Sequence, residues 1–155
     1  MKNGHIHDQV LLLPVDRQFR SLGAEVIREY PVLVNGRRGF IDLYISFPTW
    51  RLAAEAENTP RRVGWDGEKA AAAGAGGLVI LTPTWQVARA CRKAVRQQRE
   101  RGAGQSLWIC VLTPGAFLQW FRINFHLFSP SFEVSKTFPL LAPRRTATTK
   151  HQGIL

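Results

Sequence analysis

Acidic residues are scarce in this chain. Its 155 residues contain only 11 Asp and Glu against 21 Lys and Arg, so the formal net charge is +10. The sequence pI is about 10.8. A balance this basic predicts attraction to a polyanion, which means DNA, RNA or an anionic membrane surface.

Cysteines and long apolar runs are also scarce. Cys91 and Cys110 are the two cysteines and lack the paired spacing of a zinc site, which predicts two reduced, buried thiols in a cytoplasmic protein. No apolar run approaches the roughly 18 residues that a membrane span requires. The first residues, MKNGHIHDQVLLLPVDRQ, do not form a convincing signal peptide. These features predict an intracellular, soluble chain without a membrane partner.

The length fits one domain with a single core. Hydrophobic residues make up 45% and charged residues 21%, which are ordinary values for a folded protein. We expect a lead-in segment at 1–15, an α/β core at 16–114 and a loose basic tail at 139–155. Residues 115–138 form an aromatic-rich extension that either packs on the core or forms a surface for a partner.

The order of predicted elements indicates an α/β fold. The expected elements are a helix at 17–22 capped by Asp16 and stopped by Gly23, strands at 25–34, 39–46 and 51–58, a helix at 61–74, a strand at 76–84, a helix at 85–102 and a strand at 106–114. Asn35-Gly36 is a strong hairpin signal between the first two strands. The pattern predicts a mixed sheet, with an antiparallel three-strand meander followed by a β-α-β crossover, flanked by helices.

Three of the few acids lie within sixteen residues, on two neighbouring predicted strands. Alternation of side chains along the second strand puts Ile41, Leu43 and Ile45 on one face and Asp42 on the other. Glu55 and Glu57 share a face of the third strand, where small alanines leave space beside them. Carboxylate oxygens suit Mg²⁺ or Mn²⁺, and substrate phosphate commonly completes the shell of such an ion.

In so basic a chain, this arrangement predicts a metal-dependent nuclease that hydrolyses DNA phosphodiester bonds. In the simpler alternative, Glu55 and Glu57 lie on the solvent face of a half-exposed sheet. They would then form weak surface ion pairs with Arg61 and Arg62.

The order of elements and acids resembles the PD-(D/E)XK nuclease superfamily, whose restriction-endonuclease-like core has this meander and crossover. Asp42 matches the family's acid on the second strand, and Glu55-Ala56-Glu57 matches the (D/E)-x-K triplet with Glu57 in place of the lysine. The resemblance covers about residues 16–112. It implies Asp42, Glu55 and Glu57 as metal ligands, Glu57 or Lys69 as the group that activates water, and an upstream acid, Glu29 in preference to Glu25.

Several basic residues are candidates for binding the phosphate backbone. A solvated helix face is the alternative for those in the predicted helix at 85–102, although Glu100 is the only acid there. The candidates are Arg37 and Arg38 at the hairpin, Arg61 and Arg62 beside the acids, and Arg89, Lys93 and Arg96 on the helix.

Two further interpretations stay open. The loss of the strand lysine favours a catalytically degenerate, nucleic-acid-binding or scaffold subunit, active only within an assembly if at all. A homodimer, or a partner protein bound through the aromatic segment, is also consistent with a chain too small to cut both DNA strands alone. His5 and His7 have the spacing of metal ligands, but they lie at a chain end without a partner and are interpreted as structural.

Overall fold

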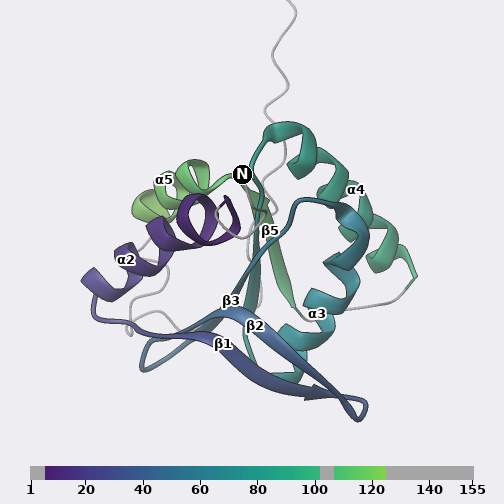
Figure 1. The fold of residues 1–155 in the computed structure, drawn as a ribbon, viewed down its shortest axis with the longest axis horizontal. Coiled ribbons are helices and arrows are strands. Elements are labelled where there is room, and N and C mark those ends of the chain that lie inside the picture. The colour runs from purple at the N-terminus through teal and green to yellow at the C-terminus, as the bar shows by residue number, and fades with distance from the viewer. Residues whose placement is uncertain (1–5, 102–106, 125–155) are drawn as a thin grey trace, which may run out of the picture.

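The computed structural model describes residues 6–101 and 107–124. They form an α/β fold around a five-stranded mixed sheet in the order β1-β2-β3-β4-β5 (Figure 1). β1 (Glu25–Val34), β2 (Arg37–Ser46) and β3 (Arg51–Ala56) form the predicted antiparallel meander. β4 (Gly77–Leu81) and β5 (Trp108–Leu112) continue the sheet in parallel with β3, so the predicted fold class is confirmed.

Helices cover both faces of the sheet. The π-helical turn η1 (Ile6–Leu12), α2 (Leu13–Ser21) and α5 (Pro114–Asn124) pack on one face, whereas the short η2 (Pro60–Arg62), α3 (Val63–Ala72) and α4 (Trp85–Glu100) pack on the other (Figure 1). Each layer buries its own core. The first core includes Phe19, Leu43 and Phe117, and the second includes Ile41, Leu78 and Cys91.

Local signals in the sequence explain the ends of these elements. Asn35 and Gly36 both have a positive φ, of 49° and 78°, as a two-residue hairpin turn requires. Gly23 and Gly74 follow α2 and α3 with φ of 84° and 68°. Glycine takes this left-handed conformation without a steric penalty, so the predicted stops are in place.

The N-terminal helix differs from the prediction. α2 begins at Leu13, earlier than the expected Arg17, and Pro14 lies in its first turn. Proline is tolerated there because the first helical amides have no acceptor within the helix. Asp16 is therefore inside the helix and not its cap. It is 6% exposed and pairs with Arg20 at 2.6 Å and with Arg28 at 2.8 Å.

The aromatic segment packs on the core over the part that is described. The α5 residues Phe117 and Phe121 are buried, and their ring centroids lie 6.0 and 4.5 Å from that of Phe19. Residues 125–138 and the basic tail at 139–155 lie outside the described residues. None of the helices within 6–101 and 107–124 is long and apolar enough to cross a membrane.

On α4 the buried side chains are those of Ala88, Cys91 and Val95. Ala90, on the same helix, is exposed. Cys91 and Cys110 are buried and free, as predicted.

Strands β2 and β3 separate at the level of Asp42. β2 pairs with β1 from Arg37 to Ser46, but it pairs with β3 only from Leu43 to Ser46. At the same level, Glu29 of β1 has a positive φ of 50°. The alternation of faces changes there, because Ile41 lies in the core under α3 and α4 whereas Leu43 lies in the opposite core. The prediction of one shared face for Ile41, Leu43 and Ile45 was therefore wrong.

Candidate functional site

A polar pocket lies where β2 and β3 separate, beneath α3. It has a volume of about 320 Å³. The residues that line it are His7, Arg37, Arg38, Gly39, Phe40, Asp42, Glu55, Ala56, Glu57, Arg62, Trp65 and Lys69. Elements far apart in the sequence thus converge on one group of carboxylates.

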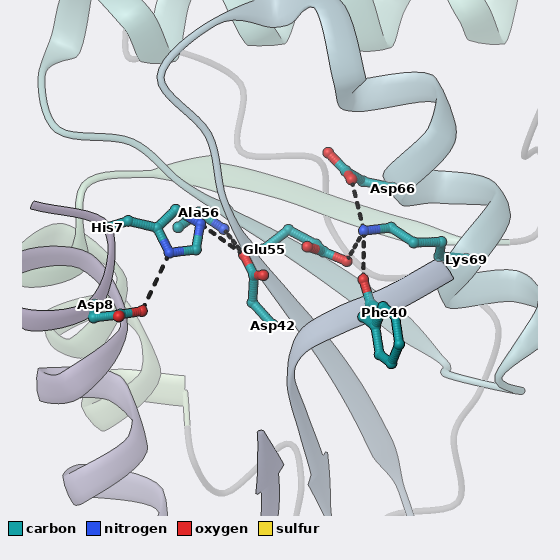
Figure 2. Close-up of polar contacts among 8 residues, drawn as sticks. All are labelled: His7, Asp8, Phe40, Asp42, Glu55, Ala56, Asp66 and Lys69. Carbon is teal, nitrogen blue, oxygen red and sulfur yellow. Dashed lines mark hydrogen bonds and ion pairs between the residues drawn. The ribbon is translucent and has the colours of Figure 1, made fainter. Parts of the chain in front are cut away.

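Asp42 bridges the gap between the two strands. Its Oδ2 accepts a hydrogen bond of 2.9 Å from the amide of Ala56, in a stretch where β2 no longer pairs with β3. The same oxygen lies 3.2 Å from Nε2 of His7, which η1 brings to the pocket (Figure 2). Burial alone raises the pKa of Asp42, but the contacts with His7 and Ala56 outweigh it and hold the pKa below its ordinary value. The Asp42 contact raises the pKa of His7 to about 9.

Lys69 joins α3 to β3 and β2. Its Nζ lies 2.6 Å from Oε1 of Glu55 and 3.1 Å from Oδ1 of Asp66, and it donates a hydrogen bond of 2.8 Å to the carbonyl of Phe40 (Figure 2). Glu55, Asp66 and Lys69 are only 2%, 1% and 6% exposed. A buried ammonium thus stands between two buried carboxylates.

The burial of these acids shifts their titration. Burial, reinforced by the carboxylates of Asp42 and Asp66, raises the pKa of Glu55 to about 9, although Lys69 opposes this shift. Burial also raises the pKa of Asp66. The pKa of Lys69 is raised because Glu55 and Asp66 outweigh its own burial. Glu55, Asp66 and Lys69 therefore each bind a proton more tightly than the same group does in water, in contrast to Asp42.

Glu57 lies directly after β3 and completes the acidic group. Its amide donates to the carbonyl of Leu81 at 2.9 Å, so the chain still follows β4 at this point. Glu57 is 7% exposed, and burial together with the nearby Asp66 raises its pKa to about 7. The burial of Glu55 and Glu57 contradicts the alternative in which they lie on a solvent face.

The pocket gathers most of the predicted residues. The acids Asp42, Glu55 and Glu57 line it together with Lys69, and the predicted basic residues Arg37, Arg38 and Arg62 stand at its rim. Other predicted residues are elsewhere. Glu29 is exposed on β1, has a positive φ and is not a lining residue. Arg61, and Arg89, Lys93 and Arg96 on α4, are exposed and do not line the pocket.

Two residues that contact the acids of this site, Asp66 and His7, were not predicted from the sequence. Asp66 lies three residues before Lys69 on α3, and this spacing puts both side chains on one helix face. Because acids are scarce in this chain, that spacing could have identified Asp66 as a partner of Lys69. His7 was interpreted as structural, because nothing in the sequence indicates that η1 brings it to Asp42. His5 lies outside the described residues.

Whether a divalent cation fits this pocket depends on which carboxylate oxygens lack a hydrogen-bond partner. Within the described residues, Glu55 Oε1 and Asp66 Oδ2 are buried without a hydrogen-bond partner. Oε1 is close to Lys69, so that contact is an ion pair without the direction of a hydrogen bond. No group of three or more Asp, Glu, His or Cys side chains in residues 6–101 and 107–124 is arranged as a set of metal ligands. Mg²⁺ usually takes only one or two carboxylates with water and substrate phosphate, so Asp42 and Glu55 suit it.

Comparison with known proteins finds no match among family models, curated proteins or solved structures. The chemistry of the pocket therefore carries the functional argument.

Proposed function

We propose that this chain is a metal-dependent endonuclease that hydrolyses DNA phosphodiester bonds. The observation that carries the proposal is the convergence of Asp42, Glu55, Glu57 and Lys69 on one pocket with arginines at its rim. Buried carboxylates are costly without a cation, and here they lie in a chain with a net charge of +10. The order of strands and acids supports a restriction-endonuclease-like core of the PD-(D/E)XK type.

Asp42 and Glu55 would hold Mg²⁺ or Mn²⁺. When bound, such an ion lowers the pKa of a water molecule and neutralises charge on the phosphate. Arg37, Arg38 and Arg62 would hold the flanking phosphates, since guanidinium groups pair well with phosphate oxygens. Glu57, whose pKa is about 7, is suited to accept the proton of the attacking water. Lys69 would orient that water from the side of Glu55.

The two buried, free thiols support a cytoplasmic location, where thiols stay reduced. Cleavage of both strands of a duplex by so small a chain would require a second copy or a partner. A homodimer or a complex with a partner protein is therefore part of the proposal.

The test is plasmid cleavage by the purified chain with Mg²⁺ or Mn²⁺, and with EDTA. Asp42→Asn and Glu55→Gln keep the shape of each side chain and remove its charge. We expect metal-dependent nicking or linearisation that both variants lose by at least about 100-fold. Glu68→Gln is the matched control, because Glu68 is exposed on the same helix as Lys69 and does not line the pocket.

One observation favours a second candidate, a nucleic-acid-binding subunit with a degenerate nuclease fold. Lys69 already neutralises Glu55 at 2.6 Å, so the pocket has an internal cation in the place where a metal ion would act. This candidate predicts salt-sensitive DNA binding with no cleavage under any metal, and identical plasmid profiles for the wild type and Asp42→Asn.

A further inference from the structure

Two arginine–aromatic stacks flank the acidic pocket, and the proposed hydrolysis assigns a role to their arginines but none to their aromatic rings. The guanidinium of Arg37 lies over the Trp65 ring, 4.6 Å from its centroid. The guanidinium of Arg38 lies over the Phe40 ring at 5.1 Å. All four residues line the pocket that holds Asp42.

The two stacks lie on opposite faces of β2. A Cβ added at Gly39 would meet Trp65 Cζ2 at 3.0 Å, so position 39 faces α3. Alternation along the strand then puts Arg37 on the α3 side and both Arg38 and Phe40 on the other side. In Figure 2 the ring of Phe40 turns away from Lys69 while its carbonyl faces the ammonium. One stack therefore stands on each side of the strand edge that borders the acids.

These stacks have the chemistry that recognises unpaired nucleotides. Phe40 is 47% exposed, which leaves ring surface beside the pocket without protein cover. Bases stack on aromatic rings and on guanidinium planes with little dependence on sequence. In a duplex the faces of each base are covered by its neighbours, so such stacking requires a nucleotide outside the helix.

The burial of the acidic side chains favours the same substrate, an unpaired nucleic-acid strand. Glu55 is 2% and Glu57 7% exposed, so a phosphate must pass below the arginine rim to reach them. Duplex DNA is stiff, with a persistence length of about 150 bp, so bending it sharply over the edge of one strand costs deformation free energy. A single strand has no such stiffness.

We propose that the pocket takes an unpaired segment of a nucleic-acid strand, which crosses the edge of β2 with its backbone at Asp42 and Glu55. Its bases stack on the Trp65–Arg37 pair on one side and on the Phe40–Arg38 pair on the other. The place of the scissile phosphate rests on the proposed nuclease function, but the stacking is measurable without cleavage.

The experiment is fluorescence anisotropy in EDTA at one fixed salt concentration, because the affinity for nucleic acids depends strongly on salt. The probes are a labelled DNA strand, the same strand as RNA, and the matching DNA duplex. We expect at least one unpaired strand to bind about tenfold tighter than the duplex. Phe40→Ala should weaken binding of that strand by about 5- to 100-fold and leave duplex binding unchanged, and Phe40→Trp should restore it.

Trp85→Ala is the matched control. Trp85 is an exposed aromatic residue with its own arginine, Arg92 at 5.4 Å from the ring centroid, and it does not line the pocket. Its removal should leave strand binding unchanged.

Equal binding of strand and duplex, or wild-type strand binding by Phe40→Ala, overturns the inference. The outcomes separate it from the nuclease proposal. If the chain prefers an unpaired strand through Phe40 but never cleaves, the binding inference holds and the nuclease proposal is wrong. If the chain cuts duplex plasmid equally well with and without Phe40, the nuclease proposal holds and the binding inference is wrong.

Discussion

The carboxylate of Asp42 accepts the hydrogen bond of the Ala56 amide, at 2.9 Å, where β2 and β3 part. The Asp42 side chain therefore has two roles. It satisfies a backbone donor on a strand that has lost its neighbour, and it presents charge to the pocket. Variants of Asp42 must therefore be tested both for stability and for cleavage, so that the two roles can be distinguished.

We expect Asp42→Ala to lower the free energy of unfolding by about 1–3 kcal/mol, because the buried Ala56 amide loses its acceptor. Asp42→Asn retains an acceptor oxygen for the Ala56 amide but loses the ion pair with His7, so it should be less destabilised than Asp42→Ala, yet still lose metal-dependent cleavage. Urea denaturation of both variants checks the first expectation, and the plasmid assay checks the second. If Asp42→Asn cleaves like the wild type, the carboxylate charge is not needed for the reaction.

The ion pair of Lys69 with Glu55 should couple their contributions to stability. Lys69→Met leaves two buried carboxylates without their cation, and breaking a buried pair costs about 3–5 kcal/mol. Adding Glu55→Gln removes one of these charges. We therefore expect the double variant to be more stable than the sum of the two single effects predicts, as measured by a double-mutant cycle in urea. Strict additivity would contradict a direct interaction between the two side chains.

Gly39 sets how closely α3 approaches β2. A Cβ there would lie 3.0 Å from Trp65 Cζ2 and 3.2 Å from Lys69 Cδ, so both side chains must shift to make room. We expect Gly39→Ala to destabilise the fold by about 1–3 kcal/mol and to reduce cleavage by moving Lys69.

Gly67→Ala is the control for this variant. Gly67 lies within α3, and an added Cβ there meets nothing within 4 Å. Because alanine favours the helix over glycine, this change should stabilise the fold by up to about 1 kcal/mol. Thermal and urea unfolding of both variants measure the contrast, and equal effects would mean that the contact with Trp65 and Lys69 is not restrictive.

Stability should fall as the pH rises from about 6 to 9. The folded-state pKa is raised to about 7 for Glu57 and to about 9 for His7. Each group therefore holds its proton more tightly when folded than when unfolded. For Glu57 this contribution is fully present below the unfolded pKa near 4.5, and for His7 below 6.5. It is lost as the pH passes the folded values.

Urea denaturation at pH 6, 7.5 and 9 measures this trend. The Glu57→Gln variant should show a shallower fall between pH 6 and 7.5, because its amide does not titrate in this range. A free energy of unfolding that rises with pH over the same window would mean that Glu57 and His7 are not held in their protonated forms.

The sequence by itself determined the order of the strands and the convergence of the predicted acids. Asn35-Gly36 and the glycines after two helices act locally, so their turns follow from residue type alone. Asp42 lies on β2, Glu55 on β3 and Glu57 directly after β3, and these two strands are neighbours both in sequence and in the sheet. Their meeting was therefore predictable from the meander.

Only the tertiary structure decided how these acids are neutralised. Lys69 reaches Glu55 because α3 packs across the sheet at Gly39, and His7 reaches Asp42 because η1 packs on the opposite side. These distances depend on how separate elements are placed, which no local pattern encodes. Glu29 also lies outside the pocket, at a position of β1 whose positive φ departs from regular β geometry. Periodicity assigns residues to faces of an ideal strand, whereas packing decides where the strand stops being ideal.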